Sequence, residues 1–305
     1  MTGRFAPTPT GGLHVGNLRT ALVSWLAARA VDQPWLIRIE DLDTGRLPDA
    51  AVTADQQLDD LARLGLTSDR PVVRQSDRFG LYAAAVAKLD TYECFCSRKD
   101  VVEATRAPHG TTPRYPGTCR DLSPAERAER HRRRPGSWRV NAHQATMTIH
   151  DVVGGDLTDQ VDDFVVRRAD GLYAYNLAVV VDDGLQGVDQ VVRGDDLLTA
   201  SPRQAWLAGQ LGFAPPVYLH LPLVYSADGT RLAKRDQAID LTTLISQGLT
   251  PDDVLDRLAW SLNLAPTGVH LSLAELVERF DPAALPRQAW LTEPSTWRSS
   301  TRPAN

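Results

Sequence analysis

The sequence predicts an α/β protein in which a doubly wound parallel sheet is interrupted by an insertion and followed by a helical region. Apolar segments typical of buried strands alternate with amphipathic helical segments in residues 1–75 and again in residues 166–240. Several of these apolar segments end in acidic residues. Residues 76–165 differ in character, because they hold all three cysteines and a stretch rich in glycine, proline and threonine.

The first 75 residues are predicted to contribute half of the sheet. A short strand over residues 3–6 leads into a glycine-rich loop, and a helix follows over residues 15–30. The segment "WLIRIED" at residues 35–41 has the dense apolar character of a buried parallel strand, and residues 51–64 predict a second helix. The apolar face of the first helix carries Leu18, Leu22, Trp25 and Leu26.

The remaining elements are expected in the following order. In the insertion, Ser123 and Glu126 form a capping box that starts a basic helix. The sheet resumes with "LYAYNLAVVVDD" and "QVVRGDDLL", both expected as strands. The segment "SPRQAWLAGQLG" is expected to be a helix that ends at its last glycine. "VYLHLPLVYSADGTRLAKRDQ" predicts a strand, an Asp-Gly turn and a strand. Capping boxes at Thr250 and Ser272 predict further helices, and "STWRSSTRPAN" is expected to be a loose tail.

Composition restricts the class of protein. The chain has 305 residues, of which 43% are hydrophobic and 23% charged, as in an ordinary globular enzyme. It shows neither a membrane-spanning run nor a secretion signal, and its three cysteines do not suggest disulfides, so we expect a cytoplasmic protein without membrane contact. The net charge of −5 means that any nucleic-acid contact needs a local basic patch. "RAERHRRRPGSWR" at residues 127–139 offers such a patch, or else an ordinary solvated helix face.

The loop "RFAPTPTGGLHVGN" near the N-terminus is a candidate phosphate site. Gly11, Gly12 and Gly16 permit close backbone approach, and the following helix offers unpaired N–H groups. The loop lacks the Lys-Ser/Thr pair of a Walker A motif and the spacing of a dinucleotide fold. On its own it indicates either a phosphate-binding loop or a plain glycine turn into a helix.

Five segments in order resemble the class I glutamyl-tRNA synthetase family, and the resemblance covers roughly residues 3–240. They are "RFAPTPTGGLHVGN", "IRIEDLD", "YAYNLAVVVDD", "VVRGDDLL" and "RLAKRD". Residues 14–17 correspond to the HIGH signature, and residues 232–235 fall where the KMSKS signature falls. Within the family, the chain is most similar to the truncated glutamyl-queuosine tRNA(Asp) synthetases. The resemblance implies a class I, Rossmann-like sheet.

This resemblance also implies a reaction and its residues. Such enzymes join glutamate to AMP from ATP, with Mg²⁺, and then transfer the glutamyl group. His14 and Lys234 would be catalytic, although each could also be an ordinary surface residue. Ala233 replaces the usual serine before the lysine, which predicts slower activation. The ATP site would comprise Pro7, Gly12, His14, Gly16, Asn17, Leu232, Lys234 and Arg235. The glutamate site would comprise Arg4, Phe5, Ala6, Pro7, Thr8, Glu40, Tyr175 and Arg193.

Roles within the glutamate site follow from its chemistry. The family pattern places Arg4 and Arg193 on the side-chain carboxylate, where a guanidinium can bind bidentately. Glu40 would take the ammonium, and Tyr175 would hydrogen-bond the substrate. Glu40 could instead be a plain sheet-end acid, and Arg193 an ion-pair partner of Asp195 or Asp196. Aspartate is one methylene shorter than glutamate, so glutamate is the expected amino acid.

The cysteines predict a structural zinc site. Cys94, Cys96 and Cys119 supply three thiolates, and a tetrahedral site needs a fourth ligand. The truncated family members use a tyrosine at the position that Tyr115 occupies, while His109 is the chemical alternative. Three cysteines without a metal remain the third possibility.

The predicted organisation has four parts. Residues 1–75 and 166–240 would form the two halves of the catalytic domain, 76–165 the zinc-bearing, acceptor-binding-like insertion, and 241–305 a helical stem-contact-like region without an anticodon-binding domain. This predicts a monomer that activates glutamate without tRNA and transfers it to queuosine in the anticodon loop of tRNA(Asp). Other acceptors, namely another tRNA, a protein or a small amine, stay open, as does a non-catalytic binding paralogue.

Overall fold

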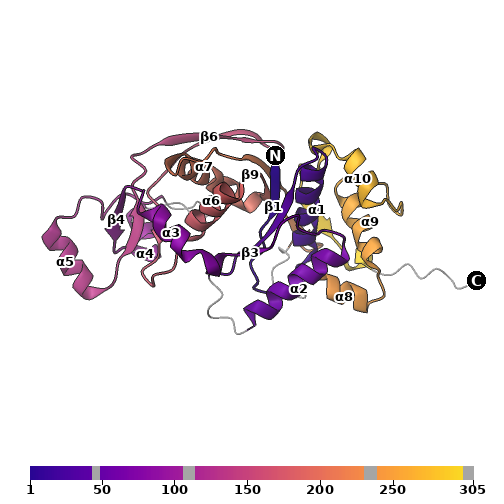
Figure 1. Cartoon of the computed structure of the whole chain (residues 1–305), viewed down its shortest axis with the longest axis horizontal. Helices are drawn as coiled ribbons and strands as arrows, with labels where there is room; N and C mark the ends of the chain where they lie inside the picture. The colour runs from indigo at the N-terminus through magenta and orange to yellow at the C-terminus, as the bar shows by residue number, and fades with distance from the viewer. Residues whose placement is uncertain (43–48, 106–113, 230–238, 298–305) are drawn as a thin grey trace, which may run out of the picture.

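A seven-stranded sheet forms the centre of the computed structural model, which describes residues 1–42, 49–105, 114–229 and 239–297 (Figure 1). Its strand order is β3-β2-β1-β9-β10-β6-β7, and the pairs are parallel except for the antiparallel β6–β7 hairpin. The parallel α/β class predicted from the sequence is therefore confirmed. The strands are β1 (Thr2–Phe5), β2 (Trp35–Ile39), β3 (Val73–Arg74), β6 (Thr146–Asp151), β7 (Gly155–Gln160), β9 (Val188–Gly194) and β10 (Val217–Leu221).

Helices cover both faces of the sheet because successive strand residues point to opposite sides. Ile37, Val192 and Leu219 face α1 (Val15–Arg29), whereas their neighbours Val191 and Tyr218 join a second cluster on the other face, which includes Ala205 of α7. The other helices in this part of the molecule are α2 (Ala50–Arg63), α3 (Phe79–Val86), α6 (Tyr175–Gln186) and α7 (Ser201–Gln210). The chain moves from β1 to β2 and β3 on one side and to β9 and β10 on the other, which makes the β1–β9 boundary a topological switch point.

The segment "LYAYNLAVVVDD" is a correction, since most of it is helix α6 rather than a strand. Residues 177–181 are all buried, so the run shows no helical period that would distinguish it from a buried strand. Its two acids are also buried, and Gly187 ends the helix in the left-handed conformation. The apolar character of this helix comes from packing on more than one side, against α3 and α7.

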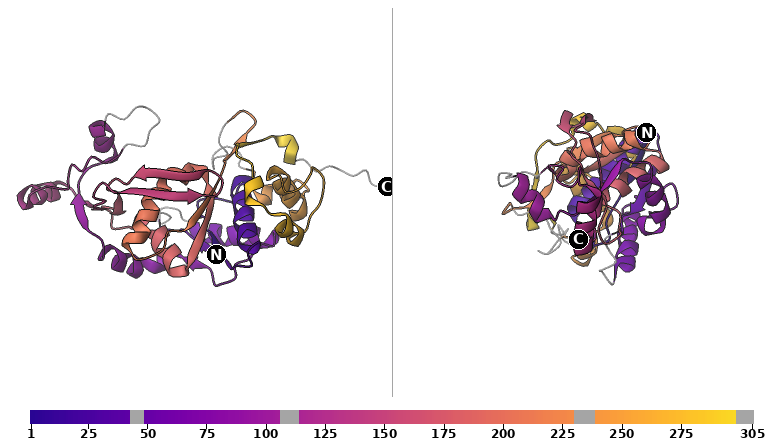
Figure 2. Two further views of the ribbon diagram at one scale, coloured as in Figure 1. Left: turned by 90° about the horizontal axis from the view of Figure 1, so that it is seen from above. Right: turned by 90° about the vertical axis from the view of Figure 1, so that its left-hand side faces the viewer.

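The insertion contains its own small sheet. Strands β4 (Thr91–Cys94), β5 (Ser137–Val140) and β8 (Val165–Arg167) are antiparallel, and α4 (Arg98–Thr105) and α5 (Pro124–Arg133) lie in the same part of the molecule (Figure 1). The capping box at Ser123 forms as predicted. The β6–β7 hairpin within the range 76–165 joins the main sheet instead, as Figure 2 shows from above. The four-part division of the chain stays a proposal.

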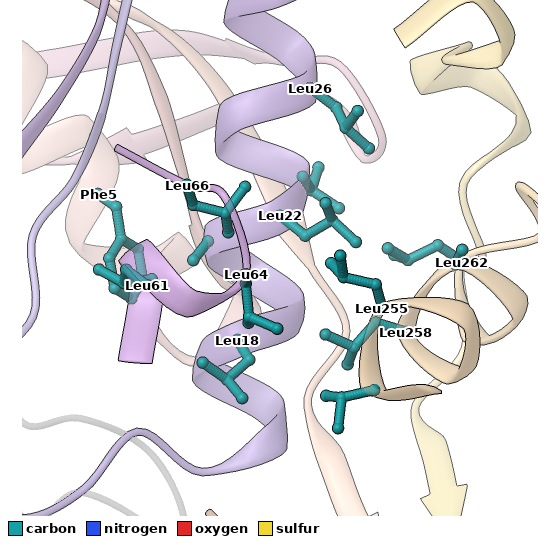
Figure 3. Close-up of a cluster of buried hydrophobic side chains, with 14 of the residues drawn as sticks. Phe5, Leu18, Leu22, Leu26, Leu61, Leu64, Leu66, Leu255, Leu258 and Leu262 are labelled. Carbon is teal, nitrogen blue, oxygen red and sulfur yellow. The ribbon is translucent and has the colours of Figure 1, made fainter. Parts of the chain in front are cut away.

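The C-terminal residues pack against α1. Helices α8 (Leu241–Ser246), α9 (Pro251–Ser261) and α10 (Leu273–Arg279) form there, two of them with the predicted capping boxes. Leu22 of α1 faces Leu255 and Leu258 of α9 in one buried cluster (Figure 3).

A strand that the sequence did not indicate, β12 (Trp290–Thr292), pairs with β11 (Val224–Ser226). The expectation of a loose tail from residue 295 is wrong at Trp297, whose buried ring packs in the core and donates Nε1–H to Thr292 at 2.7 Å. None of the described helices is long and apolar enough to cross a membrane.

Candidate active site and cysteine cluster

A pocket of about 330 Å³ opens at the carboxyl ends of the central parallel strands, beside the switch point. We call it the strand-end pocket. It gathers all eight residues predicted for glutamate and, of those predicted for ATP, Pro7, Gly12, His14, Gly16 and Asn17. The predicted residues Leu232, Lys234 and Arg235 lie outside the described part of the chain. Residues that line the pocket without having been predicted include Thr20, Gln57, Gly194, Asp196 and Leu197, together with 221–224.

His14 is the N-cap residue of α1. Its Nδ1 accepts hydrogen bonds from the backbone N–H groups of Gly16 at 3.1 Å and Asn17 at 3.3 Å. A neutral imidazole whose Nδ1 accepts must carry its proton on Nε2, so this ring presents a donor beside a helix N-terminus. A Cβ at position 16 would lie 2.9 Å from the His14 ring, which explains the need for glycine there.

The glycine loop is held from two sides. Gln57 of α2 donates its amide N–H groups to the carbonyl oxygens of Thr8 at 3.2 Å and Gly11 at 2.7 Å. On the other side, Asp240 lies so close that a Cβ at Gly12 would be 2.8 Å from its carboxylate. These contacts come from residues far along the chain, so the loop conformation depends on the fold rather than on the glycines alone.

Arg4 enters the pocket as part of a buried ion-pair network. Its Nε and Nη2 donate to the Asp183 carboxylate at 3.3 and 3.4 Å, and Arg38 donates to the same carboxylate at 2.7 Å. Burial acts to raise the pKa of Asp183, but Arg38 and Arg4 outweigh it and hold that pKa below its usual range. Asp183 and Arg38 were not predicted as site residues, although the acids ending "AVVVDD" were the available signal.

Glu40 lies in the same network. Its Oε1 accepts from Arg38 at 3.1 Å, and its side chain is buried at the pocket. Burial raises the pKa of Glu40, and the nearby Arg38 and Arg4 offset this only in part. A cation that reached this carboxylate would stabilise its ionised form.

Arg193 differs from Arg4 in that neutral groups hold it. Its guanidinium donates to His220 at 3.1 Å, to Gln204 at 2.7 Å and to Ser201 at 2.8 Å. None of the ion pairs found among the described residues involves Arg193, so the alternative of a pairing with Asp195 or Asp196 finds no support there. Tyr175, the first residue of α6, is 38% exposed at the same pocket. The pocket therefore combines one neutralised arginine with one whose charge has no carboxylate partner among the described residues.

The cysteine cluster lies in the insertion. Sγ atoms of Cys94, Cys96 and Cys119 all lie within 4.8 Å of one another, and the Cys96–Cys119 separation is 3.6 Å. A tetrahedral zinc site with Zn–S bonds of 2.3 Å requires S–S separations of about 3.8 Å. The predicted alternative ligand His109 lies outside the described residues.

Tyr115 completes this cluster. Its hydroxyl oxygen is 3.3 Å from Sγ of Cys94 and 3.9 Å from Sγ of Cys96, against about 3.5 Å expected for two ligands of one tetrahedral zinc. The backbone N–H of Cys119 donates to the same oxygen at 2.8 Å, and the Arg139 guanidinium lies 3.8 Å from the Tyr115 ring centroid. Burial and the nearby Cys94 raise the pKa of the Cys96 thiol to about 12. The donor set fits a metal that binds thiolates.

A second cavity of about 480 Å³ is lined by residues of both sites, and we call it the arginine pocket. Tyr175 borders it as well as the strand-end pocket, and Cys94 and Cys96 lie along its wall. Its cationic side chains are Arg98, Arg134 and Arg168. Arg134 pairs with Asp100 at 3.4 Å and Arg168 with Asp170 at 2.7 Å.

Comparison with known proteins identifies the family. The model for the catalytic domain of class I tRNA synthetases (E and Q) matches residues 1–259. The chain is 52% identical over 294 residues to a protein of Nocardia farcinica named glutamyl-Q tRNA(Asp) synthetase, covering 95% of this chain and 92% of that protein. It is 49% identical over 271 residues to a protein of the same name from Deinococcus radiodurans, covering 86% of this chain and 89% of that one.

Solved structures agree in fold. A glutamate tRNA ligase from Elizabethkingia meningosepticum, crystallised in complex with its amino acid, superposes with a TM-score of 0.77 at 22% identity and covers 93% of this chain. The chain spans 65% of the length of that ligase. The chain belongs to the class I glutamyl- and glutaminyl-tRNA synthetase family, and it is a synthetase-like enzyme of the ligase class.

Proposed function

We propose that the chain activates L-glutamate with ATP, without tRNA, to form glutamyl-AMP in the strand-end pocket. The observation that carries this proposal is the charge arrangement of the pocket, where Arg193, Glu40 and His14 surround one cavity. Arg193 is suited to the side-chain carboxylate of the amino acid, and Glu40 to its ammonium group. A positive and a negative charge at separate points of one pocket match the side-chain carboxylate and the ammonium group of an acidic amino acid.

In this proposal the α-carboxylate of glutamate attacks the α-phosphorus of ATP, and the bond to pyrophosphate breaks. Nε2–H of His14 and the first N–H groups of α1 would donate to phosphate oxygens, where negative charge builds up. Lys234, outside the described residues, would stabilise the departing pyrophosphate. Mg²⁺ bound with ATP would neutralise phosphate charge.

ATP–pyrophosphate exchange without RNA tests this activation step. We expect exchange with glutamate, and a kcat/KM at least about tenfold lower with aspartate, which lacks one methylene. His14 offers an informative variant. His14→Asn keeps an acceptor for the helix cap but loses Nε2–H, so exchange should fall about 100-fold with unchanged thermal stability. Exchange that requires tRNA, or that is absent with glutamate, would contradict the proposal.

We further propose that the acceptor is queuosine in tRNA(Asp). The relatives at 52% and 49% identity carry this specificity in their names, and the chain covers 92% and 89% of their length. The arginine pocket supports an RNA acceptor, because three arginines line this cavity, which Tyr175 also borders. Glutamate transfer to tRNA(Asp) with and without queuosine, and to tRNA(Glu), is the test. Formation of Glu-tRNA(Glu) would refute it.

We propose that the cysteine cluster holds one structural zinc ion, with Tyr115 as the fourth ligand. Cys94, Cys96, Cys119 and Tyr115 would enclose the ion, which would tie β4 to the segment carrying Cys119. Metal analysis of the purified chain should find about one zinc per chain, and Tyr115→Phe should weaken its retention against a chelator. A Tyr115→Phe chain that keeps zinc as firmly as the original would exclude Tyr115 as the fourth ligand.

We also propose that the protein is monomeric and cytoplasmic.

A further inference from the structure

Three buried side chains on neighbouring strands are joined by hydrogen bonds, and the last of them lines the strand-end pocket. Asp151 ends β6, His220 lies in β10 and Arg193 lies in β9, with exposed fractions of 2%, 3% and 6%. His220 and Arg193 are direct neighbours in the β9–β10 pairing, and this places both side chains on one face of the sheet. The sequence offered no sign of this arrangement, since the three residues are far apart along the chain.

The hydrogen bonds fix the position of the proton on His220. Oδ2 of Asp151 accepts from both the backbone N–H of His220 at 2.9 Å and its Nδ1 at 2.7 Å. A carboxylate only accepts, so Nδ1 carries the ring proton and Nε2 is an acceptor. Nε–H of Arg193 donates to this Nε2 at 3.1 Å. Burial lowers the pKa of His220, which keeps the ring neutral beside the guanidinium.

Asp151 is itself fixed in orientation. Its Oδ1 accepts from the backbone N–H groups of Val153 at 3.1 Å and Gly154 at 2.6 Å. Burial acts to raise its pKa, but hydrogen bonds from His220 and Gly154 outweigh this and hold the pKa below its usual range. Both oxygens therefore face donors, and an amide in place of the carboxylate must turn an NH₂ group toward one of them.

The remaining bonds of Arg193 leave one N–H for a ligand. A guanidinium has five N–H donors. Nε–H is taken by His220, one Nη1–H by Gln204, and the two on Nη2 by Ser201 and the carbonyl oxygen of Leu197. The second Nη1–H has no acceptor among the described residues, and Arg193 lines the strand-end pocket. Rotation of the guanidinium would redirect this donor, and the His220 bond opposes that rotation.

We propose that His220, held as the Nδ1–H tautomer by Asp151, is a positioning residue that orients Arg193 and so sets the affinity of the pocket for a carboxylate-bearing amino acid. This inference rests on the proposed function, because it names Arg193 as the group that binds the side-chain carboxylate. His220 acts through Arg193, since it is not among the residues that line the pocket.

Two variants of His220 separate the hydrogen bond at Nδ1, to Asp151, from those at Nε2, which lies 3.1 Å from Nε of Arg193 and 3.2 Å from the Ser201 hydroxyl oxygen. The side-chain nitrogen of asparagine falls near Nδ1, so His220→Asn keeps the bond to Asp151 but removes the acceptor for Arg193. The side-chain oxygen of glutamine reaches the place of Nε2, so His220→Gln restores that acceptor. Asp151→Asn places an NH₂ group against His220 or against Val153 and Gly154. His150→Asn is the matched control, because His150 and Asp156 form a His–Asp pair on the exposed surface of β6.

In ATP–pyrophosphate exchange, we expect His220→Asn and Asp151→Asn to raise the KM for glutamate by about 10- to 100-fold, with the KM for ATP and kcat changed less than about threefold. His220→Gln should recover most of the loss, and His150→Asn should behave as the original chain. Equal impairment of His220→Asn and His220→Gln, or a matching rise in the KM for ATP, would overturn the proposal.

A spectroscopic measurement tests the inference independently of activity. ¹⁵N NMR of the ring nitrogens should show His220 as the Nδ1–H tautomer. The Nε–H proton of Arg193 should be protected from exchange with solvent in the original chain and in His220→Gln, and unprotected in His220→Asn. The original chain could show these NMR signals but lack ATP–pyrophosphate exchange activity. In that case the proposed function fails and the positioning of Arg193 holds. An Nε2–H tautomer in the original chain would refute the positioning itself.

Discussion

The cysteine cluster and the strand-end pocket are built in opposite ways. The four side chains of the cluster come from residues 94–119, a single stretch of chain, and lie close to one another. The pocket draws on residues from Arg4 to Val224, brought together at the ends of four parallel strands. Local spacing is enough to specify the first site, while the second exists only when the sheet is assembled. The two sites should therefore respond to different perturbations, and the variants below test that separation.

The largest effect is expected from removing the charge of Arg193. Arg193→Leu should lower glutamate-dependent exchange by about 100-fold or more, because a buried charge-assisted contact with the substrate carboxylate is lost. Zinc content and the fold of the insertion should stay unchanged, since no contact of Arg193 reaches that sheet. Exchange kinetics and metal analysis on the same preparation measure both. Loss of zinc in this variant would break the separation between the two sites.

The converse change is Cys94→Ser. It should abolish zinc binding and lower the unfolding temperature, because a structural metal contributes directly to folding free energy. Glutamate-dependent exchange should fall less than about fivefold, while transfer to tRNA should fall further, since the arginine pocket includes Cys94 in its wall. Ser97→Ala, between the cysteines but without a thiol, is the control. If glutamate-dependent ATP–pyrophosphate exchange disappears together with the zinc, the two sites are coupled.

An intermediate effect is expected on the exposed face of α5. Arg132→Glu combined with Arg133→Glu should reduce transfer to tRNA about tenfold at low salt, with a smaller effect at high salt, because phosphate contacts are screened. Both side chains are exposed, and exchange without RNA should not change. The control is Lys88→Glu, which reverses the positive charge of an exposed lysine near α3. If transfer is unaffected at low salt, this patch is only a solvated helix face.

The smallest effect concerns stability beside the pocket. Burial, and then the nearby Asp240, raise the pKa of Asp60 to about 6. The folded state thus holds this proton more tightly than the unfolded state, so stability falls as pH rises from about 4 to about 6 and the loss is complete above about 6. Asp60→Asn should raise the free energy of unfolding at pH 8 by about 1–2 kcal/mol, with no gain near pH 4. Urea unfolding at both pH values measures it; an equal gain at pH 4 would contradict the assigned cause.

Much of the fold followed from local pattern. Gly11, Gly12 and Gly16 located the loop, and the first two strands and the first two helices lie within a few residues of their predicted ranges. The errors occur where several packing partners hide the period, as in α6, which was expected to be a strand. Trp297 was assigned to a tail because nothing nearby in the sequence shows that β12 pairs with β11. In these places, neighbours distant in sequence decide the structure.

By itself, the sequence determined the α/β class, the glycine loop before α1, and the cysteine spacing that brings three thiols and a tyrosine together. These features depend on backbone propensities and on residues within a few turns of one another. Only the tertiary structure decided that Asp183 neutralises Arg4, that His220 and Asp151 orient Arg193, and that Gln57 holds the loop. Those contacts join strands and helices whose order in the sheet differs from their order in the chain, so no local pattern records them.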